Sequence, residues 1–320
     1  MGGMTMLRRQ LLGLVAAAAL PGAEKPAAPP GQLRCRVTAW MGEPPLEASA
    51  LKASVEGREA KILAIRDPNS PLLLHVVLDL TGDLALISPA REALKSALAG
   101  MPENVWVALL RAQDGLRVLV DPGPKRDAAI AQLDTLDTTG RAGLLEAVEP
   151  AAALAQRVLR RSPVRQAVFF LTDSSIYNYR EDYTNPVINP SDSRDLSRRF
   201  PDALIREKAA KLAAALNAFD VPVFIQHLAF LRDRLNEAYQ TGLQQIAEAT
   251  GGSAAFSRAP GDIPGDVGQM LKRIAGLWAI DMELPAGTPR TYSVQLSAAG
   301  RDIQYRTHFT LAARGKEPKS

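Results

Sequence analysis

Two aspartates that each close an apolar run are the residues of this sequence with the clearest chemical potential. Residues 73–79 read Leu-Leu-His-Val-Val-Leu-Asp, and Thr81 and Asp83 follow. Residues 167–173 read Ala-Val-Phe-Phe-Leu-Thr-Asp, and Ser174 follows. Carboxylate and hydroxyl oxygens gathered in this way can hold a hard cation such as Mg²⁺. Alternatively, the aspartates can cap loops by accepting hydrogen bonds from backbone N–H groups.

Buried parallel strands account for both apolar runs. A strand covered by helices on both faces is continuously apolar and shows no alternation. The ligand crevice of an open α/β sheet lies outside the carboxyl ends of such strands. We therefore expect Asp79 and Asp173 to converge at one edge of a sheet.

Alternating strands and helices over residues 71–276 predict an α/β fold with a doubly wound, mostly parallel sheet. One of these helices is expected from Pro89 to Leu98, and the arginines of 157–165 are expected at a solvated helix end. Apolar and polar residues alternate in the N-terminal β segment, 33–68, and in the C-terminal β segment, 277–312. We expect both segments to pair in one small antiparallel β domain; two separate appendages are the alternative.

Local signals in the N-terminal β segment are clear. Residues 55–65 predict a hairpin that turns at 56–59. Cys35 is the single cysteine, so an intramolecular disulfide is excluded. It alternates with apolar neighbours, which indicates a packing role.

Several motifs in a fixed order carry a resemblance to a known family. They are the run from His75 to Asp83, the run from Thr139 to Val148, Phe169-Phe-Leu-Thr-Asp173, and Ile246-Ala-Glu-Ala-Thr-Gly-Gly-Ser253. Together they resemble the von Willebrand factor type A domain. The flanking β segments resemble those of bacterial exported proteins related to this domain, so the resemblance covers roughly residues 33–312. It implies a von Willebrand A-like sheet.

The resemblance also implies a metal-ion-dependent adhesion site that would hold Mg²⁺ or another divalent cation. The positions that match its ligands are Asp79, Thr81, Asp83 and Asp173. Asp83 stands where the family has a serine, and Ala142 stands where it has a threonine, so one oxygen ligand is missing. The site is therefore degenerate, and its loss is an open alternative.

Loops near this edge supply the predicted partner contacts. A polar insertion over 174–202 follows the second strand and carries tyrosine and arginine, which are enriched at binding hot spots. The predicted partner-binding residues are Gly140, Arg141, Ser174, Ser175, Tyr177, Tyr179, Arg180 and Tyr183.

These residues predict a protein-binding module of the adhesion type, with a protein or surface polymer as its partner. The alternatives are a metal-free structural scaffold of an envelope assembly and an unrecognised hydrolase. We expect no enzyme, because the three histidines are scattered and the sequence contains no P-loop, zinc-binding or nucleophile-elbow motif.

The net charge and the N-terminal sequence indicate the class of partner and the cellular location. The net charge is +4, but two arginines of the leader and the basic end of the chain account for it, and no basic stripe suggests nucleic acid. Residues 1–23 read as a signal peptide for the Sec or twin-arginine route, 24–32 as a linker and 313–320 as a tail. We expect export and no stable transmembrane anchor; a retained leader is the alternative.

Overall fold

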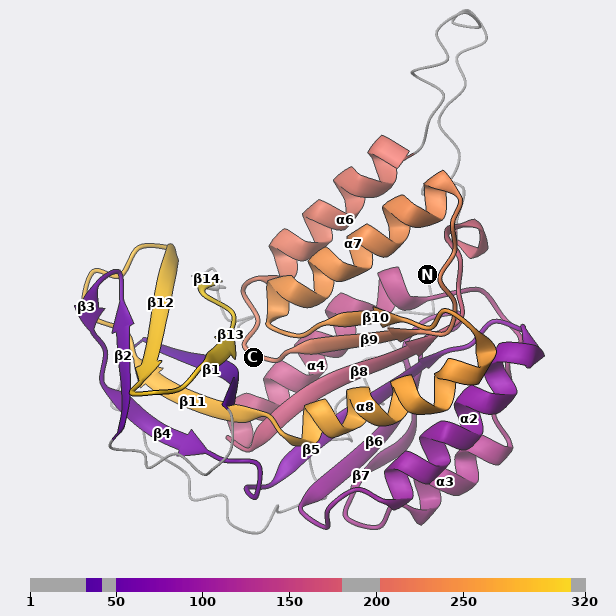
Figure 1. Cartoon of the computed structure of the whole chain (residues 1–320), viewed down its shortest axis with the longest axis horizontal. Coiled ribbons are helices and arrows are strands. Elements are labelled where there is room, and N and C mark those ends of the chain that lie inside the picture. The colour runs from indigo at the N-terminus through magenta and orange to yellow at the C-terminus, as the bar shows by residue number, and fades with distance from the viewer. Residues whose placement is uncertain (1–32, 42–49, 180–201, 312–320) are drawn as a thin grey trace, which may run out of the picture.

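The computed structural model describes residues 33–41, 50–179 and 202–311. The predicted signal peptide, linker and tail lie outside these residues. A six-stranded sheet covered by helices forms one part of the molecule, and two four-stranded antiparallel sheets form the other (Figure 1). The predicted fold class, a mostly parallel α/β sheet with a flanking antiparallel β domain, is confirmed.

The central sheet has the order β10-β9-β8-β5-β6-β7. Its strands are β5 (Leu72–Asp79), β6 (Val105–Arg111), β7 (Arg117–Gly123), β8 (Arg165–Thr172), β9 (Val223–His227) and β10 (Ala254–Phe256). Only β7 runs antiparallel to its neighbour. The chain moves outward in one direction from β5 and in the other from β8, so these two strands flank the topological switch point, where ligands of such folds bind.

Helices cover both faces of this sheet (Figure 1). They are α2 (Leu84–Ala99), α3 (Asp127–Asp134), α4 (Leu144–Arg161), α6 (Asp202–Leu216), α7 (Arg234–Thr250) and α8 (Ile263–Ala275). Phe170 of β8 packs in the core with α4, α6 and α7, and its neighbour Phe169 packs with α2, α3 and α8. Burial of both faces explains the apolar runs without alternation. Helix α2 starts at Leu84 rather than at Pro89, because the Asp83 side chain accepts a hydrogen bond from Ala85 N and caps it.

Segments from both ends of the sequence build the β domain, which is a sandwich of two sheets. One sheet holds β1 (Arg34–Met41), β4 (Ile62–Arg66), β11 (Trp278–Glu283) and β13 (Ile303–Tyr305), and the other holds β2 (Leu51–Val55), β3 (Arg58–Glu59), β12 (Thr291–Ala298) and β14 (His308–Thr310). β1 pairs with β11, and β2 pairs with β12, so the predicted pairing of the two ends is confirmed. Cys35 is buried in the shared core, as predicted.

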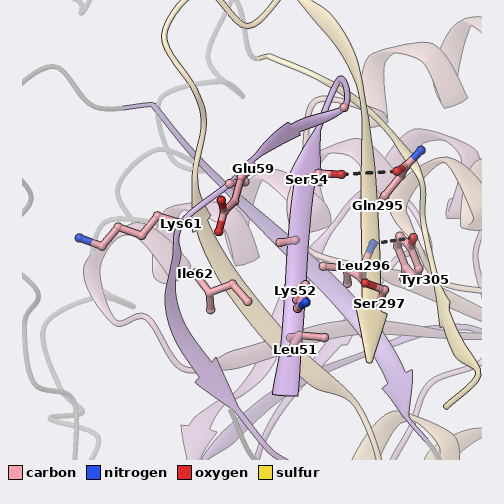
Figure 2. Close-up of a pocket in the computed structure, with 13 residues that line it drawn as sticks. Leu51, Lys52, Ser54, Glu59, Lys61, Ile62, Gln295, Leu296, Ser297 and Tyr305 are labelled. Carbon is pink, nitrogen blue, oxygen red and sulfur yellow. Dashed lines mark hydrogen bonds between the residues drawn. The ribbon is translucent and has the colours of Figure 1, made fainter. Parts of the chain in front are cut away.

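The predicted hairpin over 55–65 is correct only in its first half. β2 and β3 pair around a turn at Glu56 and Gly57, which both have positive φ. β4 instead crosses to the other sheet and pairs with β11. The crossing leaves a cavity of about 1220 Å³ beside β2 and β12, where Ser54 bonds to Gln295 and the Tyr305 hydroxyl accepts from Leu296 N (Figure 2).

Arg165 joins the two parts of the molecule. Its guanidinium donates to the carbonyls of Pro68, Ser70, Ala275 and Leu277. The expectation of a solvated position is therefore wrong for Arg165, because four carbonyl groups replace its water; burial lowers its pKa to about 10. Since Arg165 begins β8, the sandwich packs at the amino ends of the parallel strands, opposite to their carboxyl ends (Figure 1).

Candidate functional site

The structure brings Asp79 and Asp173 to the same edge of the sheet. β5 and β8 are neighbours in parallel register, with Asp79 opposite Thr172, and Asp173 N donates to Asp79 O. The two aspartate side chains nevertheless hydrogen-bond to different loops.

Asp79 is completely buried and holds three donors. Its Oδ1 accepts from Gly143 N at 2.7 Å, and its Oδ2 accepts from the hydroxyls of Thr172 and Ser174, both at 3.0 Å. Burial raises the pKa of Asp79 to about 6, and the charge of Asp173 contributes least. Asp79 thus fastens the start of α4 to the ends of two strands.

Asp173 fastens the loop between β5 and α2. Its Oδ1 accepts from Thr81 N at 2.6 Å and from Thr81 Oγ1 at 3.1 Å. Its Oδ2 accepts from Asp83 N at 3.2 Å, while the Asp83 side chain caps α2. These are the backbone contacts that the loop-capping alternative predicts.

The oxygen atoms at this edge do not form the ligand set of the divalent cation that the resemblance implies. Both oxygens of Asp79 and of Asp173 already accept from protein donors, and Ala142 is buried without an oxygen to offer. Within the described ranges, no group of three or more His, Cys, Asp or Glu side chains is arranged to hold a metal ion. Mg²⁺ needs six oxygen ligands. These carboxylate oxygens are therefore used in hydrogen bonds that hold the loops at this edge.

Ser174 and Tyr179 lie inside the molecule, so their predicted role as contact residues is corrected. Ser174 Oγ hydrogen-bonds to Asp79 and lies 3.3 Å from Tyr179 Oη and 3.2 Å from Tyr239 Oη. The two tyrosine hydroxyls are 3.0 Å apart. This buried network supports the loop after β8 from beneath. Sequence reasoning missed Tyr239, because it comes from α7, far along the chain.

His227 joins the same network through its ring nitrogens. Nε2 lies 2.7 Å from the main-chain oxygen of Ser174, and Nδ1 accepts from Ala229 N at 3.1 Å. The ring is therefore the neutral tautomer with its proton on Nε2. Burial lowers its pKa, which agrees with a neutral ring.

The other predicted contact residues are at the surface or outside the described residues. Gly140, Arg141 and Tyr177 are exposed, and Ser175 is half-buried. Arg141 lines a cavity of about 300 Å³ together with Asp114 and Glu146. Arg180 and Tyr183 lie outside the part of the chain that the structure describes.

Exposed apolar side chains follow three neighbouring strand ends. Leu84 comes after β5 and is 64% exposed, Tyr177 comes after β8 and is 58% exposed, and Phe230 comes after β9 and is 47% exposed. Since β9, β8 and β5 are adjacent, the three residues share the carboxyl edge of the sheet; we call them the apolar rim. The sequence signal for Leu84 and Phe230 is an apolar residue in the short stretch that follows a strand, beyond the end of the apolar run.

Asp173→Asn is expected to loosen the loop after β5. An asparagine has one acceptor oxygen, so either Thr81 N or Asp83 N loses its partner, at a cost of about 1–2 kcal/mol. Urea unfolding measures the loss, and hydrogen exchange should show a faster Thr81 or Asp83 amide. Asp137→Asn is the control. One oxygen of Asp137 accepts both bonds from Thr139, and the other makes only an exposed ion pair of 3.4 Å with Arg111, so the stability should hardly change. Equal stability of the Asp173 variant and the wild type would contradict this role.

Solved structures are similar to this chain at low sequence identity. No protein-family model and no curated protein matches the chain. A von Willebrand factor type A protein from Catenulispora acidiphila is 12% identical over 83% of this chain and 74% of its own, with a TM-score of 0.46. The PilB minor pilin from Streptococcus sanguinis is 14% identical over 65% of this chain and 62% of its own, with a TM-score of 0.44.

A third similar structure is the vWF domain of the type V pili tip protein Mfa5 from Porphyromonas gingivalis. It is 12% identical over 64% of this chain and 95% of its own, with a TM-score of 0.40. Domains of the von Willebrand type A kind are thus among the solved structures that this chain resembles. At these identities and TM-scores, the likeness carries no conclusion about what this chain binds or does.

Proposed function

We propose that this chain is an exported protein-binding module and that its contact surface is the carboxyl edge of the parallel sheet. The observation that carries the proposal is the apolar rim, Leu84, Tyr177 and Phe230, which follows three adjacent strands. Exposed apolar groups that gather on one part of a surface are typical of protein interaction sites, and these three follow adjacent strand ends. The leader-like residues 1–23 support export.

Rigid loops support this surface. Asp173 fixes the loop that carries Leu84, and the Ser174–Tyr179–Tyr239 network lies beneath the loop that carries Tyr177. The Tyr177 hydroxyl also donates to Asp233, ahead of α7. A surface that is already ordered loses little conformational entropy when it binds. In this proposal the aspartates organise the binding surface and do not touch the partner.

We infer no catalytic role for the buried polar groups. The Ser174 hydroxyl lies near a histidine and a carboxylate, as a serine nucleophile does, but it is completely buried. Both nitrogens of His227 are occupied by main-chain partners, so the ring cannot take a proton from Ser174 Oγ.

None of the helices in the described ranges has the length and apolar composition needed to cross a bilayer.

Removal of the apolar rim should weaken partner capture. We expect the triple variant Leu84→Ser, Tyr177→Ser, Phe230→Ser to capture its partner protein at least roughly tenfold less than the wild type, because a few apolar anchors carry most of the binding energy of an interface. Immobilised wild type and variant are incubated with extract of the producing cells, and the captured protein is quantified by mass spectrometry. All three side chains are exposed, so the fold should persist.

Leu33→Ser is the matched control. Leu33 is 39% exposed but lies just before β1, in the sandwich, at the other end of the molecule. An equal loss of capture in this variant would favour a structural scaffold without a discrete site. Capture that survives protease treatment of the extract would point to a surface polymer. Either result contradicts the proposal.

A further inference from the structure

A second cavity lies at the junction of the sandwich and the helix-covered sheet. Its volume is about 500 Å³, and four arginines and two aspartates are among its lining residues. Its walls come from the start of β1, the last turn of α4 and the loop before β9. Small-molecule sites are often found in cavities of this size at such junctions.

Both carboxylates of the cavity are already engaged. Asp281 pairs with Arg36 and with Arg66. Asp220 is half-buried and accepts from Gln156 Nε2 at 3.0 Å, and desolvation raises its pKa. Arg36 is engaged too, because its remaining N–H groups donate to the carbonyls of Pro163 and Val164. These groups are therefore parts of the wall.

Three further arginines are not engaged. Arg34, Arg160 and Arg161 are exposed, and none of their guanidinium groups forms a hydrogen bond or ion pair with a residue in the ranges 33–41, 50–179 and 202–311. Basic residues in the last turn of a helix complement its dipole, which accounts for Arg160 and Arg161. That explanation does not cover Arg34, which reaches the same cavity from β1.

We propose that this cavity binds a small oxyanion, a molecule that carries phosphate or carboxylate groups. The planar guanidinium fork matches both groups and binds them through paired, charge-assisted hydrogen bonds. Leu159 and Pro163 add apolar wall, which suits the carbon skeleton of an organic anion. The cavity lies at the amino-terminal side of the sheet, so this site is separate from the apolar rim.

Calorimetric titration of the full chain with pyrophosphate and with citrate, at low ionic strength, tests the proposal. We expect the wild type to bind at least one of the two probes. Binding of pyrophosphate alone assigns phosphate, and binding of citrate alone assigns carboxylate. The double variant Arg160→Gln, Arg161→Gln and the single variant Arg34→Gln should each raise the Kd roughly tenfold or more, because each removes charge-assisted hydrogen bonds.

Arg157→Gln is the matched control. Arg157 is exposed on the same helix one turn earlier and does not line the cavity, so its loss should leave the Kd unchanged. Thermal unfolding of all variants by circular dichroism verifies that they fold. The proposal is overturned if neither probe binds, if Arg34→Gln binds as the wild type does, or if Arg157→Gln weakens binding as much as the double variant.

Discussion

Gly143→Ala is expected to lower the free energy of unfolding by roughly 4 kcal/mol or more, an exceptionally large effect for one methyl group. A Cβ at this position would lie 1.9 Å from Ala112 O and 2.7 Å from Ala112 C. Both atoms are backbone, so no side-chain rotation relieves the overlap. The backbone around residue 143 would have to move to relieve the overlap. This movement would pull Gly143 N away from Asp79 Oδ1 and leave a buried carboxyl without one of its donors.

Urea unfolding of the wild type and variant measures this effect. Gly268→Ala is the control, because a Cβ at this site in α8 meets no atom within 4 Å. Alanine stabilises a helix interior over glycine, so this variant should gain about 0.5–1 kcal/mol. If Gly143→Ala unfolds at the same urea concentration as the wild type, the close approach of the two loops is not a feature of the folded protein.

Asp79→Asn is expected to make the protein more stable than the wild type at pH 7.5. The pKa of Asp79 is raised from 3.8 to about 6 in the folded state, mainly by burial. A raised carboxyl pKa contributes stability that is fully present below the unfolded-state pKa and is lost as the pH rises through the folded-state pKa. The wild type should therefore lose roughly 2 kcal/mol from this residue between pH 4 and pH 7.

Asparagine imitates the protonated carboxyl and carries no such pH dependence. Its oxygen can accept from Gly143 N, and its amide can donate to the Thr172 and Ser174 hydroxyls after these rotate. We expect a gain of about 2 kcal/mol at pH 7.5 that shrinks towards pH 4.5, as measured by urea unfolding across this range.

Asp79→Ala separates charge from hydrogen bonding. It leaves Gly143 N and both hydroxyls without their acceptor, so it should destabilise the protein at every pH. If Asp79→Asn is as unstable as Asp79→Ala at pH 7.5, the negative charge itself is required at this position. That result would favour the cation that the sequence suggested.

The sequence predicts the elements of this fold well because their signals are local. The apolar runs that end at Asp79 and Asp173 are neighbouring parallel strands. Gly251 ends α7 in the left-handed conformation, as glycine commonly does at a helix C-terminus. The switch in hydrophobic period at both ends of the chain correctly marks the sandwich.

The errors concern contacts between distant residues. The resemblance places Asp83 among the cation ligands, whereas its main-chain N–H bonds to the distant Asp173 and its side chain caps α2. The sequence pattern predicts a solvated Arg165, but its partners are four carbonyls from two distant segments of the chain. Ser174 and Tyr179 have the residue types of a contact surface, yet both are buried and their hydroxyls hydrogen-bond to Tyr239 of α7. Side-chain direction depends on tertiary packing, which local patterns do not encode.

Site-specific cross-linking tests most directly whether the carboxyl edge is a contact surface. The photoreactive residue p-benzoylphenylalanine replaces Leu84, Tyr177, Phe230 or, as the control, Leu33, and the producing cells are irradiated. We expect the three edge positions to form adducts with one and the same protein, and position 33 to form none with it. Adducts at position 33 alone, or different proteins at each edge position, would contradict a single binding surface at the ends of β5, β8 and β9.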